Sequence, residues 1–317
     1  MTTFLWLIAF LAGIGAIVWG AEAFAEHLGK AAVALGVSSF ALALLLAGAE
    51  PEELATAVAA SLRGSPGIAL GDVIGANVTV CLIALGVGAM IAPLPFSGSA
   101  LRYALLGLPL GVIGAWFAWD GNVSRPEGTI LVILYLVYVV LIWIVERHPP
   151  TLGEVGELAE AHRYPDRSKR VGLDLIFVVS GVLAMAAGAT LLVEAVRRIS
   201  HIQSTQTKLG LTVVGFATGF ELVVLAWSAS RRGAAEAVVA GVVGSFAYNV
   251  TMTLGAAALV HPLVLQDMNQ LHLPLLAMLA SLVLVIGLAI PRKRLIRRHA
   301  IALFIAYGVF LFFVLHH

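Results

Sequence analysis

The sequence predicts an all-α membrane protein in which about ten transmembrane helices form two inverted five-helix repeats. Three observations lead to this prediction. Of the 317 residues, 60% are hydrophobic and only 12% are charged, whereas soluble domains carry about 25% charged residues. Apolar runs long enough to span a bilayer as a helix recur along the whole chain. Matching residues also recur, in the same order, in the two halves.

Each of the ten apolar runs is close to the roughly 20 residues that span a hydrocarbon core. The first run has no basic segment before it and leads into Glu22, Glu26 and Lys30, so we expect a transmembrane helix rather than a cleaved signal peptide. The predicted helices cover residues 3–25, 38–62, 67–92, 99–119, 127–146, 172–196, 207–230, 235–260, 270–290 and 298–315.

A polar segment divides the chain near its middle. Residues 147–170 contain Pro149, Pro150 and Pro165 together with many charges. The predicted organisation is therefore a first repeat over 1–146, a cytoplasmic linker over 147–170 and a second repeat over 171–317.

The two halves match at a constant spacing of 168 residues, which becomes 169 after one inserted residue. Because five helices are an odd number, the second copy must enter the membrane from the opposite side. Inverted repeats of this kind are the architecture of many secondary transporters. The matches include Gly20-Ala21 with Gly188-Ala189, Glu53-Leu54 with Glu221-Leu222, Arg63-Gly64 with Arg232-Gly233, Gly75 with Gly244, and Pro93 with Pro262.

Basic residues in the loops predict the orientation. If the N-terminus faces out, 14 of the 19 Lys and Arg residues lie in inner loops, as the positive-inside tendency requires. We therefore expect both termini outside and the segments 147–170 and 292–298 in the cytoplasm, in a bacterial-type inner or plasma membrane. The formal net charge of +1 gives no reason to expect a nucleic-acid partner, and the single Cys81 cannot form a disulfide framework or a cysteine metal site.

Each repeat carries a carboxylate inside its second helix, Glu53 in the first and Glu221 in the second. A charged side chain at mid-membrane costs at least ~2.5 kcal/mol unless a partner offsets it. Pro51 removes a backbone donor from the first of these helices, and Gly215 and Gly219 loosen the second. Broken helices expose carbonyl oxygens, which are ligands for hard cations. The pattern predicts a cation site between the repeats.

Two stretches of the first half resemble the first alpha-repeat of the calcium/cation antiporter superfamily, which includes the sodium/calcium exchangers. They are Gly48-Ala49-Glu50-Pro51-Glu52-Glu53-Leu54 and Gly71-Asp72-Val73-Ile74-Gly75-Ala76-Asn77. Phe220-Glu221-Leu222 and Gly244-Ser245-Phe246-Ala247-Tyr248-Asn249 resemble the second alpha-repeat.

The resemblance implies that Glu53 and Glu221 face each other at mid-membrane and bind Ca²⁺, or Na⁺ in exchange. It implies further ligands at Ser245 and Asn249, and Thr218 stands near the hydroxyl pair of the family. Glu52 is an additional candidate because it neighbours the matched glutamate. Asp72 could equally be a cap at a helix start.

The first repeat departs from the family pattern at several positions. The proline lies one place early, at Pro51, and Glu50 occupies a hydroxyl position. Ala76 and Val80 are apolar where the family has a serine and an amide. Sodium coupling therefore has fewer oxygens to use, and either Na⁺ or H⁺ remains open as the counter-ion.

These observations predict a secondary antiporter, and not an enzyme, that exchanges Ca²⁺ or another small inorganic cation for Na⁺ or H⁺ by alternating access. Besides the transported cations and membrane lipid, we expect no cofactor, no nucleic acid and no protein partner. Two alternatives remain. The carboxylates Glu50, Glu52 and Glu53 could serve an intramembrane metal-dependent enzyme, although no HExxH or GxSxG motif accompanies them. The chain could also be a transporter-like sensor that moves no ions.

Overall fold

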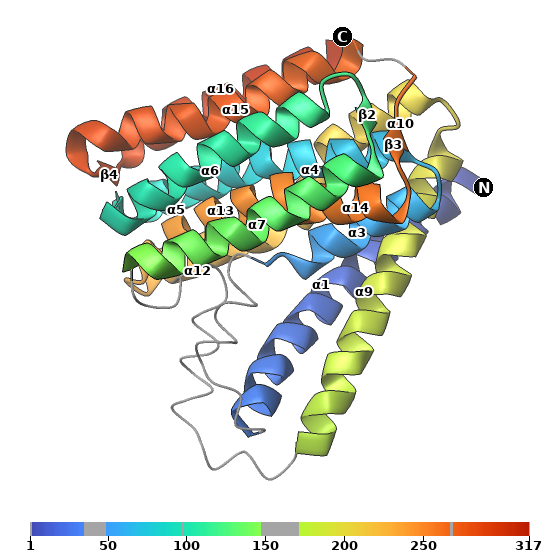
Figure 1. Ribbon diagram of the computed structural model, residues 1–317, viewed down its shortest axis with the longest axis horizontal. Coiled ribbons are helices and arrows are strands. Elements are labelled where there is room, and N and C mark those ends of the chain that lie inside the picture. Colours follow the sequence, from blue (N-terminus) through green and yellow to red (C-terminus); the bar gives the residue numbers. More distant parts are fainter. Residues whose placement is uncertain (1, 35–48, 97, 147–170, 267–268, 317) are drawn as a thin grey trace.

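The computed structural model describes residues 2–34, 49–96, 98–146, 171–266 and 269–316 (Figure 1). Most of these residues are helical. The elements of the first half are α1 (Thr2–Ala34), α3 (Pro51–Leu62), α4 (Pro66–Thr79), η1 (Val80–Ala84), α5 (Leu85–Ile91), β1 (Leu94–Pro95), α6 (Gly98–Phe117), β2 (Asn122–Val123) and α7 (Arg125–Glu146).

The second half repeats this order. Its elements are α9 (Val171–Ile199), α10 (Gln203–Leu209), η3 (Gly210–Val214), α11 (Gly215–Thr218), α12 (Phe220–Arg231), α13 (Ala235–Tyr248), η4 (Asn249–Thr253), α14 (Leu254–Val260), β3 (Leu263–Val264), α15 (Asn269–Ala289), η5 (Ile290–Arg292), β4 (Arg294–Leu295) and α16 (Arg297–His316). The elements η1, η3 and η4 are single π-helical turns, and η5 is a 3₁₀ turn.

Nine helical segments of the described residues are long and apolar enough to span a bilayer. They coincide with nine of the ten predicted spans. The predicted helix 38–62 is the tenth, and only its second part, α3, falls within the described residues. α1 continues to Ala34 rather than ending near residue 25, and an ion pair between Glu26 and Lys30, one helical turn apart, lies on this polar extension.

Two segments form the centre of the bundle. In the most apolar part of the span from α4 to α5, 78% of the residues are buried, and in that of the span from α13 to α14, 83% are buried. The corresponding share in the outer helices α1, α7, α9 and α16 is only 22–33%. Small residues line these central segments and let neighbouring backbones approach closely. In Figure 1, α15 and α16 lie above the central segments, α7 crosses in front of α13 and α14, and α1 and α9 form a separate inclined pair below.

Two features of the structure repeat with the inverted symmetry. The π turns η1 and η4 begin at Val80 and Asn249, which differ by the predicted spacing of 169 residues. Two antiparallel strand pairs, which we call the interrepeat strand pairs, join β1 to β4 and β2 to β3. They lie at opposite ends of the bundle (Figure 1). The predicted fold class is confirmed. The linker 147–170 lies outside the described residues, so the division into domains stays a prediction.

The α1–α9 pair packs through glycines. A Cβ atom on Gly13 would lie 2.8 Å from the carbonyl oxygen of Gly188, and one on Gly20 would lie 2.6 Å from that of Gly181. Both distances are too short for any side chain. The two contacts are equivalent, since Gly13 and Gly20 correspond to Gly181 and Gly188 at the spacing of 168 residues. The two helices therefore meet backbone to backbone along this face.

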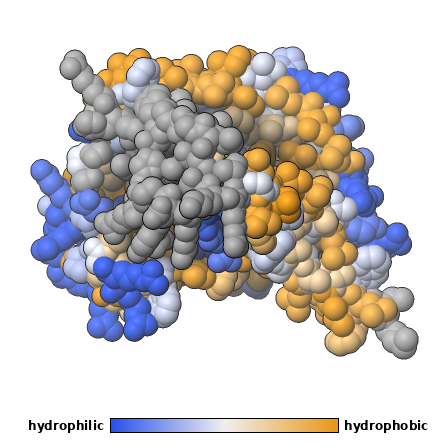
Figure 2. Space-filling model, turned by 90° about the horizontal axis from the view of Figure 1, so that it is seen from below, coloured by the Kyte–Doolittle hydropathy of each residue, from blue (hydrophilic) through white to orange (hydrophobic). Residues whose placement is uncertain are grey.

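The surface is apolar between two polar ends. In Figure 2 hydrophilic residues gather toward the left and right ends of the molecule, and apolar residues cover much of the visible surface between them. Large side chains such as Phe4, Ile133 and Ile305 are more than half exposed. Contiguous exposed apolar surface of this extent is suited to lipid and not to water.

Candidate cation-binding site

The first acidic residues of the site lie at the start of α3. This helix begins at Pro51, whose missing N–H falls at a position where a helix has no internal acceptor for it. Glu52 and Glu53 follow in the first turn and are almost completely buried, with 2% and 1% of their surface exposed. The positive end of the helix dipole favours carboxylates at this position.

The second repeat has the same construction. Its second transmembrane segment is interrupted at Gly219, between α11 and α12, and Gly219 lies 168 residues after Pro51. Glu221 follows in the first turn of α12 and is half-buried. In each repeat a glutamate therefore lies in the first turn of a helix, two residues after Pro51 in the first repeat and two residues after the interruption at Gly219 in the second. Residues 35–48 lie outside the described part of the chain, so the break expected before α3 stays a prediction.

Amide and hydroxyl groups of the central helices lie next to Glu53. Asn249 Nδ2 donates to Asn77 Oδ1 and to Ser245 Oγ, each at 3.3 Å. Thr253 Oγ1 donates to Asn249 Oδ1, also at 3.3 Å. The Asn249 amide lies beside the Glu53 carboxylate. Side chains from both repeats therefore meet at one buried place.

A second group of side chains continues this cluster toward α12. Thr218 Oγ1 donates to Asp72 Oδ1 at 2.8 Å, and Asp72 lies within electrostatic reach of Glu53. Glu52 is in contact with the carboxyl group of Glu221. The six predicted ligands consequently lie in one cluster. Glu221 lies at its edge and contacts the cluster through Glu52.

Two residues contribute more than the sequence indicated. Asn77 is not among the predicted ligands, although it is the one amide in α4. Asp72 was a possible helix-start cap, but α4 begins at Pro66 after Ser65, so Asp72 lies within the helix, with its side chain completely buried. Tertiary packing brings both residues to the site, and no local pattern reveals that packing.

Several acidic oxygens of the cluster are unsatisfied. Both carboxylate oxygens of Glu53, one of Glu52 and one of Asp72 have no hydrogen-bond partner among the residues that the structure describes. Within the same residues, no Lys or Arg forms an ion pair with these three side chains. A buried carboxylate without a partner costs several kcal/mol. A bound cation or proton would offset that cost.

Acidic residues alone do not complete a metal site. In the described part of the chain, no three acidic, histidine or cysteine side chains are arranged to hold a metal ion. A cation at Glu53 would therefore need neutral oxygens from Asn77, Ser245, Asn249 or Thr218. Hard cations accept such ligands.

The apolar positions of the first repeat pack against the helix break of the second. A Cβ atom on Gly215 would lie 2.5 Å from the backbone nitrogen of Ala76, and one on Gly219 would lie 3.2 Å from Val80 Cγ1. Both Ala76 and Val80 are completely buried. This side of the cluster is closed by methyl groups, so the first repeat offers its polar atoms from Asp72 and Asn77 instead.

The α1–α9 pair lies beside the acidic cluster. A cavity of about 10 Å³, enough for about one water molecule, separates them. Its apolar wall comes from Ile14, Ile17 and Val18 of α1 and Leu192 of α9, and its other wall from Ala217, Thr218, Glu52 and Glu221.

Comparison with known proteins gives consistent matches over nearly the whole chain. The pattern of the family described as sodium/calcium exchanger protein matches residues 5–144 and 173–316. A membrane protein of Methanocaldococcus jannaschii is 24% identical over 277 residues, which cover 87% of this chain and 86% of that protein. The sodium/calcium exchanger MaX1 of Methanosarcina acetivorans is 26% identical over 311 residues, which cover 87% and 89%.

A solved structure shows the same fold. The sodium-calcium exchanger NCX_Mj, soaked with 100 mM Na⁺ and 10 mM Sr²⁺, matches with a TM-score of 0.62 at 22% identity, over 97% of each chain.

Proposed function

We propose that this chain, which belongs to the sodium/calcium exchanger protein family, is a secondary antiporter that binds Ca²⁺ or another small inorganic cation at Glu53 and Glu221. Family membership supports cation exchange across a membrane. The observation that supports this particular site is that both carboxylate oxygens of Glu53, one of Glu52 and one of Asp72 are buried without a hydrogen-bond partner among the described residues.

The chemistry of the cluster fits a hard cation. Ca²⁺ prefers six to eight oxygen ligands, and carboxylates, amide carbonyls and hydroxyls are all suitable. Glu53 and Asn249 would form the centre of the shell, with Ser245, Asn77 and Thr218 beside them. Two carboxylates neutralise one divalent ion, so a site assembled from both repeats suits a doubly charged substrate.

The counter-ion would be Na⁺ or H⁺. Exchange requires that a second cation or proton compensate the carboxylates after the first ion leaves. The contact between Glu52 and Glu221 supports a role for protons, because two carboxylates in contact repel each other unless a proton or cation lies between them. Glu52 would then belong to the site as a further acidic ligand.

Alternating access would come from movement of the α1–α9 pair relative to the central helices. These two helices form the apolar wall of the cavity beside Glu52 and Glu221. Their glycine-lined contact makes them one unit, which could shift between positions that open the cluster to one membrane face or the other.

The direct test is cation flux in proteoliposomes with Glu53→Gln and Glu221→Gln. Glutamine keeps the volume but removes one negative charge, so a divalent ion would be held with uncompensated charge, at a cost of several kcal/mol. We expect each variant to lose exchange while remaining folded, and the double variant to be little worse than either single one, because residues of one site do not act additively.

Glu236→Gln is the matched control, since Glu236 is exposed in the first turn of α13. It should exchange like the parent protein. The thermal stability of each variant is measured with and without Ca²⁺. If both site variants still transport and retain Ca²⁺-dependent stabilisation, the proposed site is wrong. Stabilisation by Ca²⁺ without flux in the parent protein would instead identify a sensor.

A further inference from the structure

A second cavity lies away from the acidic cluster, between α15 and α16. It has a volume of about 370 Å³, within the range of ligand-sized pockets. The α15 side is formed by Leu273, Leu276, Ala277, Ala280 and Leu284, and the α16 side by Ala306, Val309, Phe310 and Phe313. Both sets have the spacing of one helical face. We call this cavity the α15–α16 groove.

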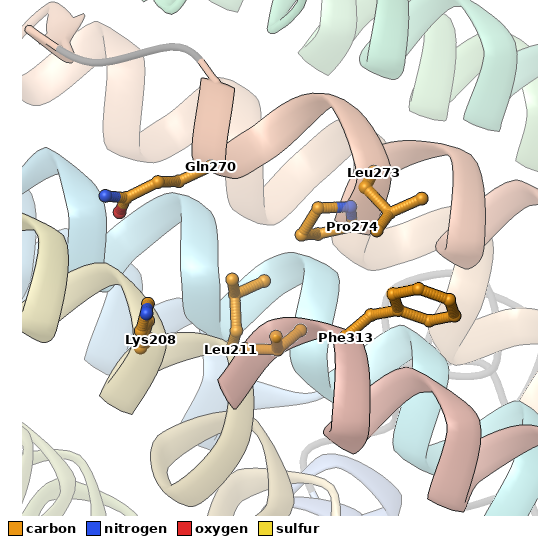
Figure 3. Close-up of a pocket in the computed structure, with 7 residues that line it drawn as sticks. Lys208, Leu211, Gln270, Leu273, Pro274 and Phe313 are labelled. Atoms are coloured by element: carbon orange, nitrogen blue, oxygen red, sulfur yellow. The ribbon is translucent and has the colours of Figure 1, made fainter. Parts of the chain in front are cut away.

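The groove joins a smaller pocket, which contains two polar side chains, at one membrane face. Leu273 and Phe313 line both spaces. The other residues of the pocket are Lys208, Leu211, Gln270, Pro274 and Val314. Figure 3 shows Lys208 and Gln270 toward one side of this pocket and Leu273 and Phe313 toward the other. One continuous surface therefore has a polar end and an apolar end.

Lys208 supplies the charge at the polar end. It lies five residues after the start of α10, about 7 Å along the helix axis, and its side chain is half-buried. Within the described part of the chain, no carboxylate forms an ion pair with Lys208. An ammonium group at this depth needs an anionic partner or water at the membrane surface.

We propose that this surface binds one anionic phospholipid, with its phosphate between Lys208 and Gln270 and one acyl chain in the α15–α16 groove. The positive charge at the membrane face matches the negative headgroup, and the apolar stripes match the acyl chain. A soluble anion would leave the groove unused, and an uncharged lipid would leave Lys208 without a partner. The site lies apart from the exchange site and does not depend on the function proposed for it.

Native mass spectrometry of the full chain with dioleoylphosphatidylglycerol or dioleoylphosphatidylcholine tests the proposal. One Lys near a membrane surface contributes about 1 kcal/mol toward an anionic lipid, which is a preference of about fivefold. We expect Lys208→Gln to remove this preference. Ala280→Phe should fill the groove and lower retention of both lipids severalfold. Ala277→Phe is a second groove variant if Ala280→Phe does not fold.

Two controls match these changes. Lys293→Gln removes the same charge beside β4, at the opposite end of the bundle, and Val283→Phe adds bulk to an exposed position of α15 that does not line the groove. Both should retain lipid like the parent protein. The proposal is overturned if the parent protein retains the two lipids equally, if Lys208→Gln keeps the preference, or if groove-filled protein retains lipid normally. A lipid-free dimer would overturn it in favour of contact between copies of the chain.

Discussion

At the scale of single residues, the proposed cation site combines several buried carboxylates with few hydrogen-bond partners in the described part of the chain. Glu53 is buried next to the Asn249 amide, and neither of its oxygens is satisfied within the described residues. The first repeat has methyl groups at Ala76 and Val80. Asp72, in the middle of α4, and Asn77, in its last turn, bring polar atoms to the same cluster instead. In the first repeat the polar atoms of the cluster therefore come from other positions of the same helix.

Asp72→Asn tests whether this different placement of the polar atoms matters for cation binding. The amide keeps a hydrogen-bond acceptor for Thr218 and removes only the charge. We expect the apparent affinity for Ca²⁺ to fall about tenfold or more, since losing ~1.4 kcal/mol of attraction has that effect. Titration of the Ca²⁺-dependent thermal shift measures it. Asp120→Asn, at an exposed position, is the control, and an unchanged Ca²⁺ affinity in Asp72→Asn would contradict the role.

Ala76 and Val80 make a separate prediction about coupling. They remove a hydroxyl and an amide that the family pattern places in the first repeat. We expect Ca²⁺ flux to depend weakly, or not at all, on external Na⁺ in proteoliposomes. A steep, sigmoidal Na⁺ dependence would show that other oxygens replace the missing ones.

At the scale of elements, sequence patterns located the helices well and their π turns and short strands poorly. Spans such as α7 and α16 are evident because apolar length alone predicts a membrane helix. The π turns η1 and η4 have no sequence signal of their own, and strands of two residues are too short to leave an alternating pattern. The glutamates could be predicted from the helix breaks, whereas Asn77 required knowledge of which helices touch.

The close contact between α1 and α9 can be tested by comparing substitutions at two nearby glycines of α1, only one of which lies in the contact. Gly13→Ala places a methyl group against the backbone of Gly188, which should destabilise the pair by about 1–3 kcal/mol and slow exchange. Gly15→Ala is the control, because nothing lies within 4 Å of its added Cβ atom. Flux and thermal stability of the two variants are compared. Equal behaviour would show that the close packing of these helices is not needed.

At the scale of the whole molecule, the interrepeat strand pairs and the basic loops group the same helix ends on the same side of the membrane. β1 and β4 are at one end with Arg292 and Arg294, and β2 and β3 are at the other. The multi-pass membrane architecture follows from the helices and the family. The absolute orientation is a further prediction from the Lys and Arg distribution.

Cysteine labelling in a Cys81-free background tests this orientation. Asn122→Cys in β2 should react with an impermeant reagent added outside, because β2 is expected to face out. Arg294→Cys in β4 should react only after the membrane is opened. Ser168→Cys in the predicted cytoplasmic linker should behave like Arg294→Cys. Labelling of this variant from outside would contradict the proposed topology.

The interrepeat strand pairs are one contact made twice. β1 and β3 follow the third transmembrane segment of their repeats, and β2 and β4 follow the fourth. Each pair therefore joins the same two places, once from each half, as in an isologous dimer interface with a twofold axis. Two separate five-helix chains inserted in opposite directions could make both pairs without any linker. The fold thus keeps the interface of an antiparallel homodimer, and the covalent connection is an addition to an assembly that symmetry already specifies.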